Sequence, residues 1–275
     1  MTKDSILIVL VLYKCELQNS LSYRSLTQTK QHLSVPYHLL VFNNSPEIAV
    51  PPSDQYEVAH EATNVMLSGA YNHALQVAAS AKDTWLLLLD QDTQLTESYF
   101  QTLSAFFQQQ YDTNIVNVVP RLLGNGRVIS PHRTQFFHSF RQPVLQSGEH
   151  DGHVIALNSV SLLSVDFMQS IGGFSSEFPL DMLDKWTSLQ IFKQHKKYYV
   201  LDTTLEHHLS VLDTRQYMSE SRYSRLLESE YHYFKKLGKI HVVLYQCRLI
   251  FRFIKQLLLF NNKAYAVLTC KHIFR

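Results

Sequence analysis

The chain has 275 residues, of which 45% are hydrophobic and 17% charged, so it can bury a substantial core, and this composition excludes global disorder. Its formal net charge of +2 argues against a nucleic-acid-binding protein. The three cysteines, Cys15, Cys247 and Cys270, are far apart and odd in number, which fits reduced thiols in the cytoplasm and matches no zinc motif. We expect no signal peptide, because the apolar run Ile6–Leu12 lacks a basic leader and a small-residue cleavage site. We expect no transmembrane helix, because no apolar run reaches roughly 20 residues.

Apolar runs alternate with helical patterns over the first 119 residues. Strands are expected at Ile6–Leu12, His38–Phe42, Tyr56–Ala59, Trp85–Leu89 and Ile115–Val119, and helices over residues 17–34, 68–81 and 97–110. The first and fourth runs are continuously apolar, as strands buried on both faces are. This alternation predicts an α/β fold with a mostly parallel sheet flanked by helices.

The second half of the chain is less regular. Residues 121–152 are polar and weakly periodic, which predicts a long loop that is mobile or contacts substrate. A strand is expected at Ile155–Ser164, a turn at Gly172–Phe174, a helix at Met182–His195 and a last strand at Tyr198–Leu201. The pattern is then helical to the end, so we divide the chain into a domain of residues 1–212 and a C-terminal helical region of residues 213–275.

Polar side chains follow two of the expected strands. Asn43-Asn44 and Asp90-Gln91-Asp92 both stand where parallel strands end, and in such sheets the ligand crevice lies beyond those ends. Two carboxylates one residue apart can divide a task, one reaching a ribose while the other holds a divalent cation that neutralises a diphosphate. The alternative is a pair of solvated turn residues.

A second acidic pair, Asp181 and Asp184, stands at the start of an expected helix. Residues three apart share one face of a helix, near the positive end of its dipole. In the alternative reading one of the pair, in the first place Asp181, has a purely structural role as the N-cap of the helix. A carboxylate here could instead take the proton of an attacking hydroxyl, and Asp184 is the candidate for that base.

Several ordered blocks of sequence resemble bacterial family 2 glycosyltransferases, and in particular the branch with rhamnosyltransferases and other surface-polysaccharide enzymes. The blocks are ILIVLVLYK, VFNNSP, NVMLSGAYNHAL, WLLLLDQDT, ALNSVSLLS, IGGFSSEFPLDMLDKW and LEHHLS, and the resemblance covers roughly residues 4–235. The resemblance implies a GT-A fold, which is Rossmann-like, with a C-terminal helical extension. It also implies an inverting transfer of a sugar from a nucleotide diphosphate donor, such as a UDP- or dTDP-sugar, to a glycan acceptor.

The resemblance also assigns site residues. It implies five residues at the nucleotide sugar, which are Tyr13, Asn43, Asn64, Asn72 and Asp90. Asp92 and His207 would hold Mg²⁺ or Mn²⁺, with His208 as an adjacent competitor to His207. Asp184 matches the catalytic base of the family, with Asp181 as the second candidate.

The sequence departs from the family pattern at several positions. Met66 and Val160 stand where the family has glycine, and Trp186, Thr187 and Gln190 replace an acidic residue, Trp and Arg. These departures bear on the donor and the acceptor. They also keep open a second reading, in which the chain is a degenerate, non-catalytic scaffold or glycan-binding protein. A nucleotidyltransferase is disfavoured because the stretch Tyr13–Ser20 contains no glycine for a phosphate-binding loop.

The C-terminal segment YQCRLIFRFIKQLLLF, residues 245–260, places Arg248, Arg252 and Lys255 at helical spacing beside a broad apolar surface. This pattern predicts a helix that lies on an anionic membrane, which would suit a cytoplasmic enzyme peripheral to the cell membrane with a lipid-linked acceptor. The alternative is a helix packed on its own domain or on a second subunit.

Overall fold

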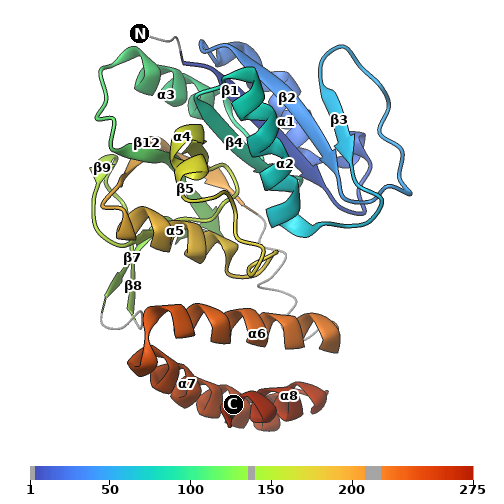
Figure 1. The fold of residues 1–275 in the computed structure, drawn as a ribbon, viewed down its shortest axis with the longest axis vertical. Coiled ribbons are helices and arrows are strands. Elements are labelled where there is room, and N and C mark those ends of the chain that lie inside the picture. The colour runs from blue at the N-terminus through green and yellow to red at the C-terminus, as the bar shows by residue number, and fades with distance from the viewer. Residues whose placement is uncertain (1–3, 136–139, 208–217, 275) are drawn as a thin grey trace. The chain divides into compact units, whose positions relative to one another are not determined.

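The computed structural model describes residues 4–135, 140–207 and 218–274, drawn in Figure 1. The chain divides into two compact units, Met1–His208 and Leu209–Arg275. The boundary expected at residue 212 lies outside the described residues.

A nine-stranded sheet forms the centre of the described part of the first unit. Its strands are β1 (Ile6–Leu12), β2 (Tyr37–Asn43), β3 (Glu57–His60), β4 (Trp85–Asp90), β5 (Ile115–Gly124), β6 (Arg127–Ser130), β9 (Gly148–His150), β11 (Leu162–Ser164) and β12 (Lys197–Glu206). The order is β3-β2-β1-β4-β11-β5-β12-β9, with β6 paired to β5. β3, β2, β1 and β4 are mutually parallel, and β5 and β12 point the same way because β11 is antiparallel to both β4 and β5. This confirms the mostly parallel sheet.

Helices cover this sheet. They are α1 (Leu21–Thr29), α2 (Met66–Ala81), α3 (Glu97–Gln108), α4 (Val165–Ser170) and α5 (Leu183–Lys193). Side-chain hydroxyls of Ser20, Thr96 and Ser164 cap the N-termini of α1, α3 and α4. Alternate residues of β1 and β4, such as Ile8 and Leu87, pack in one cluster with Leu26 of α1 and Phe100 of α3. The intervening residues face the other way, toward α2, which packs on β1 and β4.

Three expectations for local structure were wrong. Residues 121–152 are not one long loop, because they contain β6, β9 and the hairpin of β7 (His132–Gln135) and β8 (Phe140–Pro143). The strand expected at Ile155–Ser164 is broken into β10 (Val154–Ile155), which joins β7 and β8 in a small second sheet, and β11 of the main sheet. The helix expected over residues 17–34 is α1 flanked by short 3-10 helices.

The second unit consists, over its described residues, of α6 (Glu220–Leu237), α7 (Lys239–Leu259) and α8 (Ala264–Ile273). Ser219 caps α6, and Gly238, with φ of 115°, makes the sharp turn from α6 into α7. These helices confirm the expected helical C-terminal region. Among the described helices, none is long and apolar enough to span a bilayer.

Candidate active site

Polar residues gather where β1, β2 and β4 end. In the parallel register Leu12 lies beside Asn43, Val11 beside Asp90, and Asn43 beside His60 of β3. The side chains that follow these strands are therefore brought to one edge of the sheet, as the sequence predicts for Asn43-Asn44 and Asp90-Gln91-Asp92.

The turn after β4 is held by the N-terminus of α1. The carbonyl oxygen of Gln91 accepts hydrogen bonds from the Leu21 N–H (2.9 Å) and the Ser20 hydroxyl (3.0 Å). The Ser22 hydroxyl bonds the Asp90 carbonyl oxygen and accepts from the Thr93 N–H at 3.0 Å. The main chain of the turn is thus fixed without its carboxylates, which are left for other partners.

Three carboxylates influence one another at this turn. Burial and the neighbouring charge of Asp92 raise the pKa of Asp90 to about 6, and the charge of Asp184 acts in the same direction. The hydroxyl of Tyr71, on α2, lies 3.1 Å from Asp90 Oδ1, and this contact, together with one from Ser159, partly offsets the rise in the pKa of Asp90. The cluster therefore carries negative charge that the protein itself compensates incompletely.

One oxygen of this cluster lacks a hydrogen-bond partner among the residues that the structure describes. This atom, Asp92 Oδ1, is buried. A buried polar atom without a partner costs free energy, and a bound cation is one of the ordinary explanations for its retention. Since hard divalent cations prefer carboxylate and phosphate oxygens, Asp92 fits the metal position that the sequence gives it. No group of three or more His, Cys, Asp or Glu side chains is arranged to hold a metal in the part of the chain that the structure describes, so a cation here would need oxygens from its ligand.

His207 lies beside the same turn, although it is 114 residues away along the chain from Thr93. It forms an antiparallel bridge with Thr93, and its Nδ1 lies 2.9 Å from Thr93 Oγ1. Thr93 Oγ1 also lies 2.9 Å from the Ser159 hydroxyl. His207 is 7% exposed, and its position supports a role near Asp92. Its competitor His208 lies outside the described residues.

Asp184 occupies the first turn of α5. Its charge contributes to raising the pKa of Asp90 and of Tyr71, so the tertiary structure links it to the turn after β4. The residue at the N-cap of α5 is Met182, with φ of 68°, and its side chain makes no capping hydrogen bond. The idea that Asp181 is the cap is therefore wrong, and the choice between Asp181 and Asp184 as the base stays a prediction.

Tyr13 is the aromatic residue at this edge and it is 46% exposed. Its N–H donates to Gln91 Oε1 (2.8 Å), which ties it to the turn after β4, and the Lys14 ammonium lies 5.3 Å from its ring centroid. An exposed ring next to a cation is suited to stacking on a nucleotide base.

The asparagines assigned to the nucleotide are engaged with the protein. Asn43 is buried, and its amide donates to the Ile48 carbonyl (2.7 Å) and accepts from the Ser45 N–H (2.9 Å). Asn64 Oδ1 accepts from the Met66 N–H at 2.7 Å. These bonds shape the loops after β2 and before α2, so any contact of Asn43 with a nucleotide stays a prediction.

Asn72 joins α2 to the loop before α5. Its amide donates to the Phe174 carbonyl and accepts from the Phe174 N–H, both at 2.8 Å. A Cβ on Gly173 (φ of 82°) would come within 2.5 Å of Asn72 Oδ1, which requires glycine there. The preceding residue, Tyr71, packs on the Phe174 ring and bonds Asp90, so this clamp also positions the acidic cluster.

Sequence reasoning missed Tyr71, Ser159 and Ser22. Tyr71 is the one aromatic residue within the alanine-rich helix α2, and Ser22 opens α1, yet no local pattern distinguishes them from core and capping residues. Tyr71 and Ser22 both contact Asp90, which lies 19 residues along the chain from Tyr71 and 68 residues from Ser22.

The two positions where the sequence departs from glycine have the backbone of glycine. Met66 and Val160 both have φ of 60°. The left-handed region costs a residue with a side chain about 1 kcal/mol or more, and most for a β-branched one. The chain therefore holds Met66 and Val160 in a strained backbone conformation that favours glycine.

Comparisons with known proteins agree with this fold. Residues 39–163 match the model of the family described as "Glycosyl transferase family 2". No curated protein matches the chain by sequence. Among solved structures, TarS 1–349 from S. aureus aligns with a TM-score of 0.52 at 13% identity, covering 84% of this chain and 72% of that one. The mannosyltransferase PcManGT from Pyrobaculum calidifontis, in complex with GDP-Man and Mn²⁺, aligns with a TM-score of 0.54 at 11% identity, covering 99% of this chain and 80% of that one. At such identities the likeness shows a shared GT-A, Rossmann-like fold.

Proposed function

We propose that this chain, which carries a glycosyltransferase family 2 domain, moves a sugar from a nucleotide diphosphate donor to an acceptor hydroxyl. The observation that carries the proposal is the acidic cluster at the edge of the parallel strands. Asp90, Asp92 and Asp184 lie within electrostatic reach of one another, and Asp92 Oδ1 is buried with no hydrogen-bond partner among the described residues. A site of this charge binds a cation together with an anionic ligand in preference to either an anion or a neutral ligand alone.

Asp92, with His207 beside the same turn, would hold Mg²⁺ or Mn²⁺. When bound, that cation would supply the positive charge that offsets the departing nucleotide diphosphate. Asp90 would accept a hydrogen bond from a ribose hydroxyl, and Tyr13 would stack on the base. The presence of GDP-Man and Mn²⁺ in PcManGT supports this assignment by analogy of fold. The donor that we propose here is a UDP- or dTDP-sugar.

Asp184 is the proposed base. Its carboxylate would take the proton from the acceptor hydroxyl as the acceptor oxygen bonds the anomeric carbon and the bond to the diphosphate breaks on the opposite face. This single displacement inverts the anomeric configuration. The acceptor that we propose is a glycan, lipid-linked and destined for bacterial surface polysaccharide, with rhamnose among the sugars to test.

The test is a donor screen that follows release of the nucleotide diphosphate, with Mn²⁺ and with a chelator. The expected result is release from one class of donor, which depends on the metal and on acceptor, and a product of inverted anomeric configuration by NMR. Asp184→Asn should retain donor binding by calorimetry and lose turnover. Asp181→Asn is the matched control, since it removes the neighbouring carboxylate. Absence of binding to every nucleotide diphosphate would instead favour the non-catalytic scaffold.

A further inference from the structure

Helix α7 leaves its most apolar face uncovered. Ten large hydrophobic side chains from residue 239 onward are exposed, and we call them the apolar stripe: Ile240, Val243, Ile250, Phe251, Ile254, Leu257, Leu258 and Leu259 of α7, Val267 of α8, and Phe274 directly after α8. Phe251 and Leu258 are 74% and 75% exposed. Most of the α7 members recur at three- and four-residue spacing, so they lie along one side of a helix about 30 Å long.

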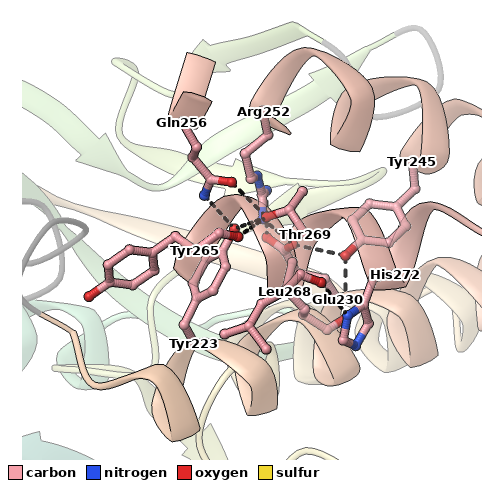
Figure 2. Close-up of polar contacts among 10 residues, drawn as sticks. Tyr223, Glu230, Tyr245, Arg252, Gln256, Tyr265, Leu268, Thr269 and His272 are labelled. Carbon is pink, nitrogen blue, oxygen red and sulfur yellow. Dashed lines mark hydrogen bonds and ion pairs between the residues drawn. The ribbon is translucent and has the colours of Figure 1, made fainter. Parts of the chain in front are cut away.

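The side of α7 that packs within the helical unit is unusually polar. Gln256 is 3% exposed and donates to the Tyr223 hydroxyl at 2.7 Å, and it accepts from Thr269 of α8 at 2.7 Å (Figure 2). Arg252 forms a two-pronged ion pair with Glu230 of α6, at 2.7 and 3.0 Å. Tyr245 donates to the same carboxylate at 3.1 Å.

This arrangement reverses the usual polarity of a surface helix, in which the apolar face is the covered one. The hydrogen-bonded network fixes α7 against α6 and α8, so α7 cannot turn its stripe inward without breaking it. A continuous exposed apolar surface formed by ten large side chains is unfavourable in water and indicates a surface that a membrane or another protein covers.

The segment that carries the stripe has basic residues and no acidic ones. No aspartate or glutamate occurs from residue 239 to the end of the chain. The exposed lysines are Lys239 and Lys255 on α7, Lys263 between the helices and Lys271 on α8. Lys263 and Lys271 also border an apolar groove between α7 and α8 that Phe253, Leu257 and Val267 line.

We propose that α7 and α8 bind the surface of an anionic lipid membrane, with the apolar stripe at the level of the acyl chains and the lysines at the headgroups. The charges favour lipid over a second copy of this chain, because two such faces would bring lysines against lysines. Helix α7 lies in the plane of the interface, in keeping with the absence of a membrane-spanning helix among the described ones.

The membrane contact is independent of sugar transfer, although it would place a transferase beside a lipid-linked acceptor if the proposed function holds. It also corrects the earlier expectation in one respect. Arg252 of the predicted basic stripe is paired with Glu230, so the larger share of the contact with headgroups falls to the exposed lysines, Lys239, Lys255, Lys263 and Lys271.

The test is flotation of the full chain with vesicles of phosphatidylcholine alone and of phosphatidylcholine mixed with phosphatidylglycerol. We expect binding to the mixed vesicles that weakens as salt is raised. The double variant Phe251→Glu, Leu258→Glu should lower binding roughly tenfold or more, since it removes two large apolar contacts. Lys271→Glu should lower it at least about fivefold.

Matched controls separate the stripe from general effects. Leu145→Glu changes an exposed leucine (64%) of the first unit, and Lys235→Glu changes an exposed lysine of α6. Both should bind as the unaltered chain does, and circular dichroism should show that all variants fold. Cys247 is exposed between the stripe residues and can carry a fluorophore in a chain with Cys15→Ser and Cys270→Ser. The emission maximum of this fluorophore should shift to shorter wavelength when mixed vesicles are added.

Two results would overturn the proposal. One is equal binding by the stripe variant and the Leu145 control. The other is a chain that binds neither kind of vesicle and is dimeric by light scattering, while the stripe variant is monomeric. That result would assign the stripe to the contact with a second copy. Neither result depends on donor binding, so a failure here is distinguishable from a failure of the proposed transferase activity.

Discussion

The two units of this chain place their polar and apolar groups in opposite ways. In residues 4–207 apolar strands fill the interior, and the carboxylates of Asp90, Asp92 and Asp184 collect at one edge of the sheet. In residues 218–274 the polar network of Gln256 and Arg252 lies inside, and the apolar stripe lies outside. Each unit therefore leaves a different quantity uncompensated, negative charge in the first and apolar surface in the second. The negative charge of the first unit favours a cation bound together with an anionic ligand. The apolar surface of the second unit favours lipid.

The largest expected effect tests the uncompensated charge. Asp92→Asn should lower sugar transfer at least about a hundredfold, because it replaces the carboxylate that would hold the cation by a neutral amide. Asp166→Asn is the control, since Asp166 is exposed and follows β11, which ends beside the start of β4 and so at the far edge of the sheet. Nucleotide release with Mn²⁺ is the measurement. Full activity of Asp92→Asn would refute the metal role.

The second effect tests the polar interior of the helical unit. Arg252→Met should destabilise that unit by about 3 kcal/mol, because Glu230, whose side chain is 12% exposed, would lose its ionic partner. Thermal unfolding measures this loss. Lys255→Met, which removes an exposed charge from the same helix, should change little. Adding Glu230→Leu to Arg252→Met should restore much of the stability, and a single variant as stable as the control would contradict the network.

The third effect follows from the pKa of Asp90. Its value of about 6 in the fold exceeds the ordinary value of 3.8, so between these pH values the folded chain retains a proton that the unfolded chain has lost. Ionising Asp90 therefore costs stability as pH rises from about 4 to about 6, by about 2 kcal/mol for this partly exposed residue. In the presence of chelator, Asp90→Asn should lack this decline in the free energy of unfolding. Identical pH profiles would mean that Asp90 carries no such charge.

The smallest effect tests strain rather than charge in the first unit. Met66→Gly should raise the free energy of unfolding by up to about 1 kcal/mol, because it relieves a side chain at φ of 60° while adding freedom to the unfolded chain. Leu67→Gly, one residue further into α2, should instead destabilise by about 1 kcal/mol. Denaturant unfolding compares the two. Equal losses would show that the positive φ of Met66 is without cost.

Much of the sheet and part of the site could be predicted from the sequence. The continuous apolar runs of β1 and β4 identify strands buried on both faces, and their common direction brings Asp90 and Asp92 to the edge with Asn43. The strands of residues 121–152 were not predicted, because β6 to β9 are three to four residues long and half-exposed or polar, so they lack the alternation that marks a strand. Nor was the reversed direction of β11, which depends on its neighbours β4 and β5.

The site residues show the same limit. The family pattern placed Asn72 near the nucleotide, but its amide is bound to Phe174, 102 residues away. Tyr71, which bonds Asp90, looked like a core residue of an alanine-rich helix. A local pattern predicts which kinds of group a side chain can hydrogen-bond. It does not predict which distant group the tertiary structure brings into contact with that side chain.

The sequence by itself determined the α/β class, the edge at which the acidic residues meet and the amphipathic character of α7. Only the tertiary structure decided that Asp92 has a buried oxygen with no hydrogen-bond partner among the described residues. It also decided that Arg252 forms an ion pair with Glu230 and that the apolar side of α7 is exposed. Periodicity fixes which side chains share a face of a helix or strand, because backbone geometry is local. Which face is covered depends on contacts between residues far apart along the chain, and these arise only when the elements pack.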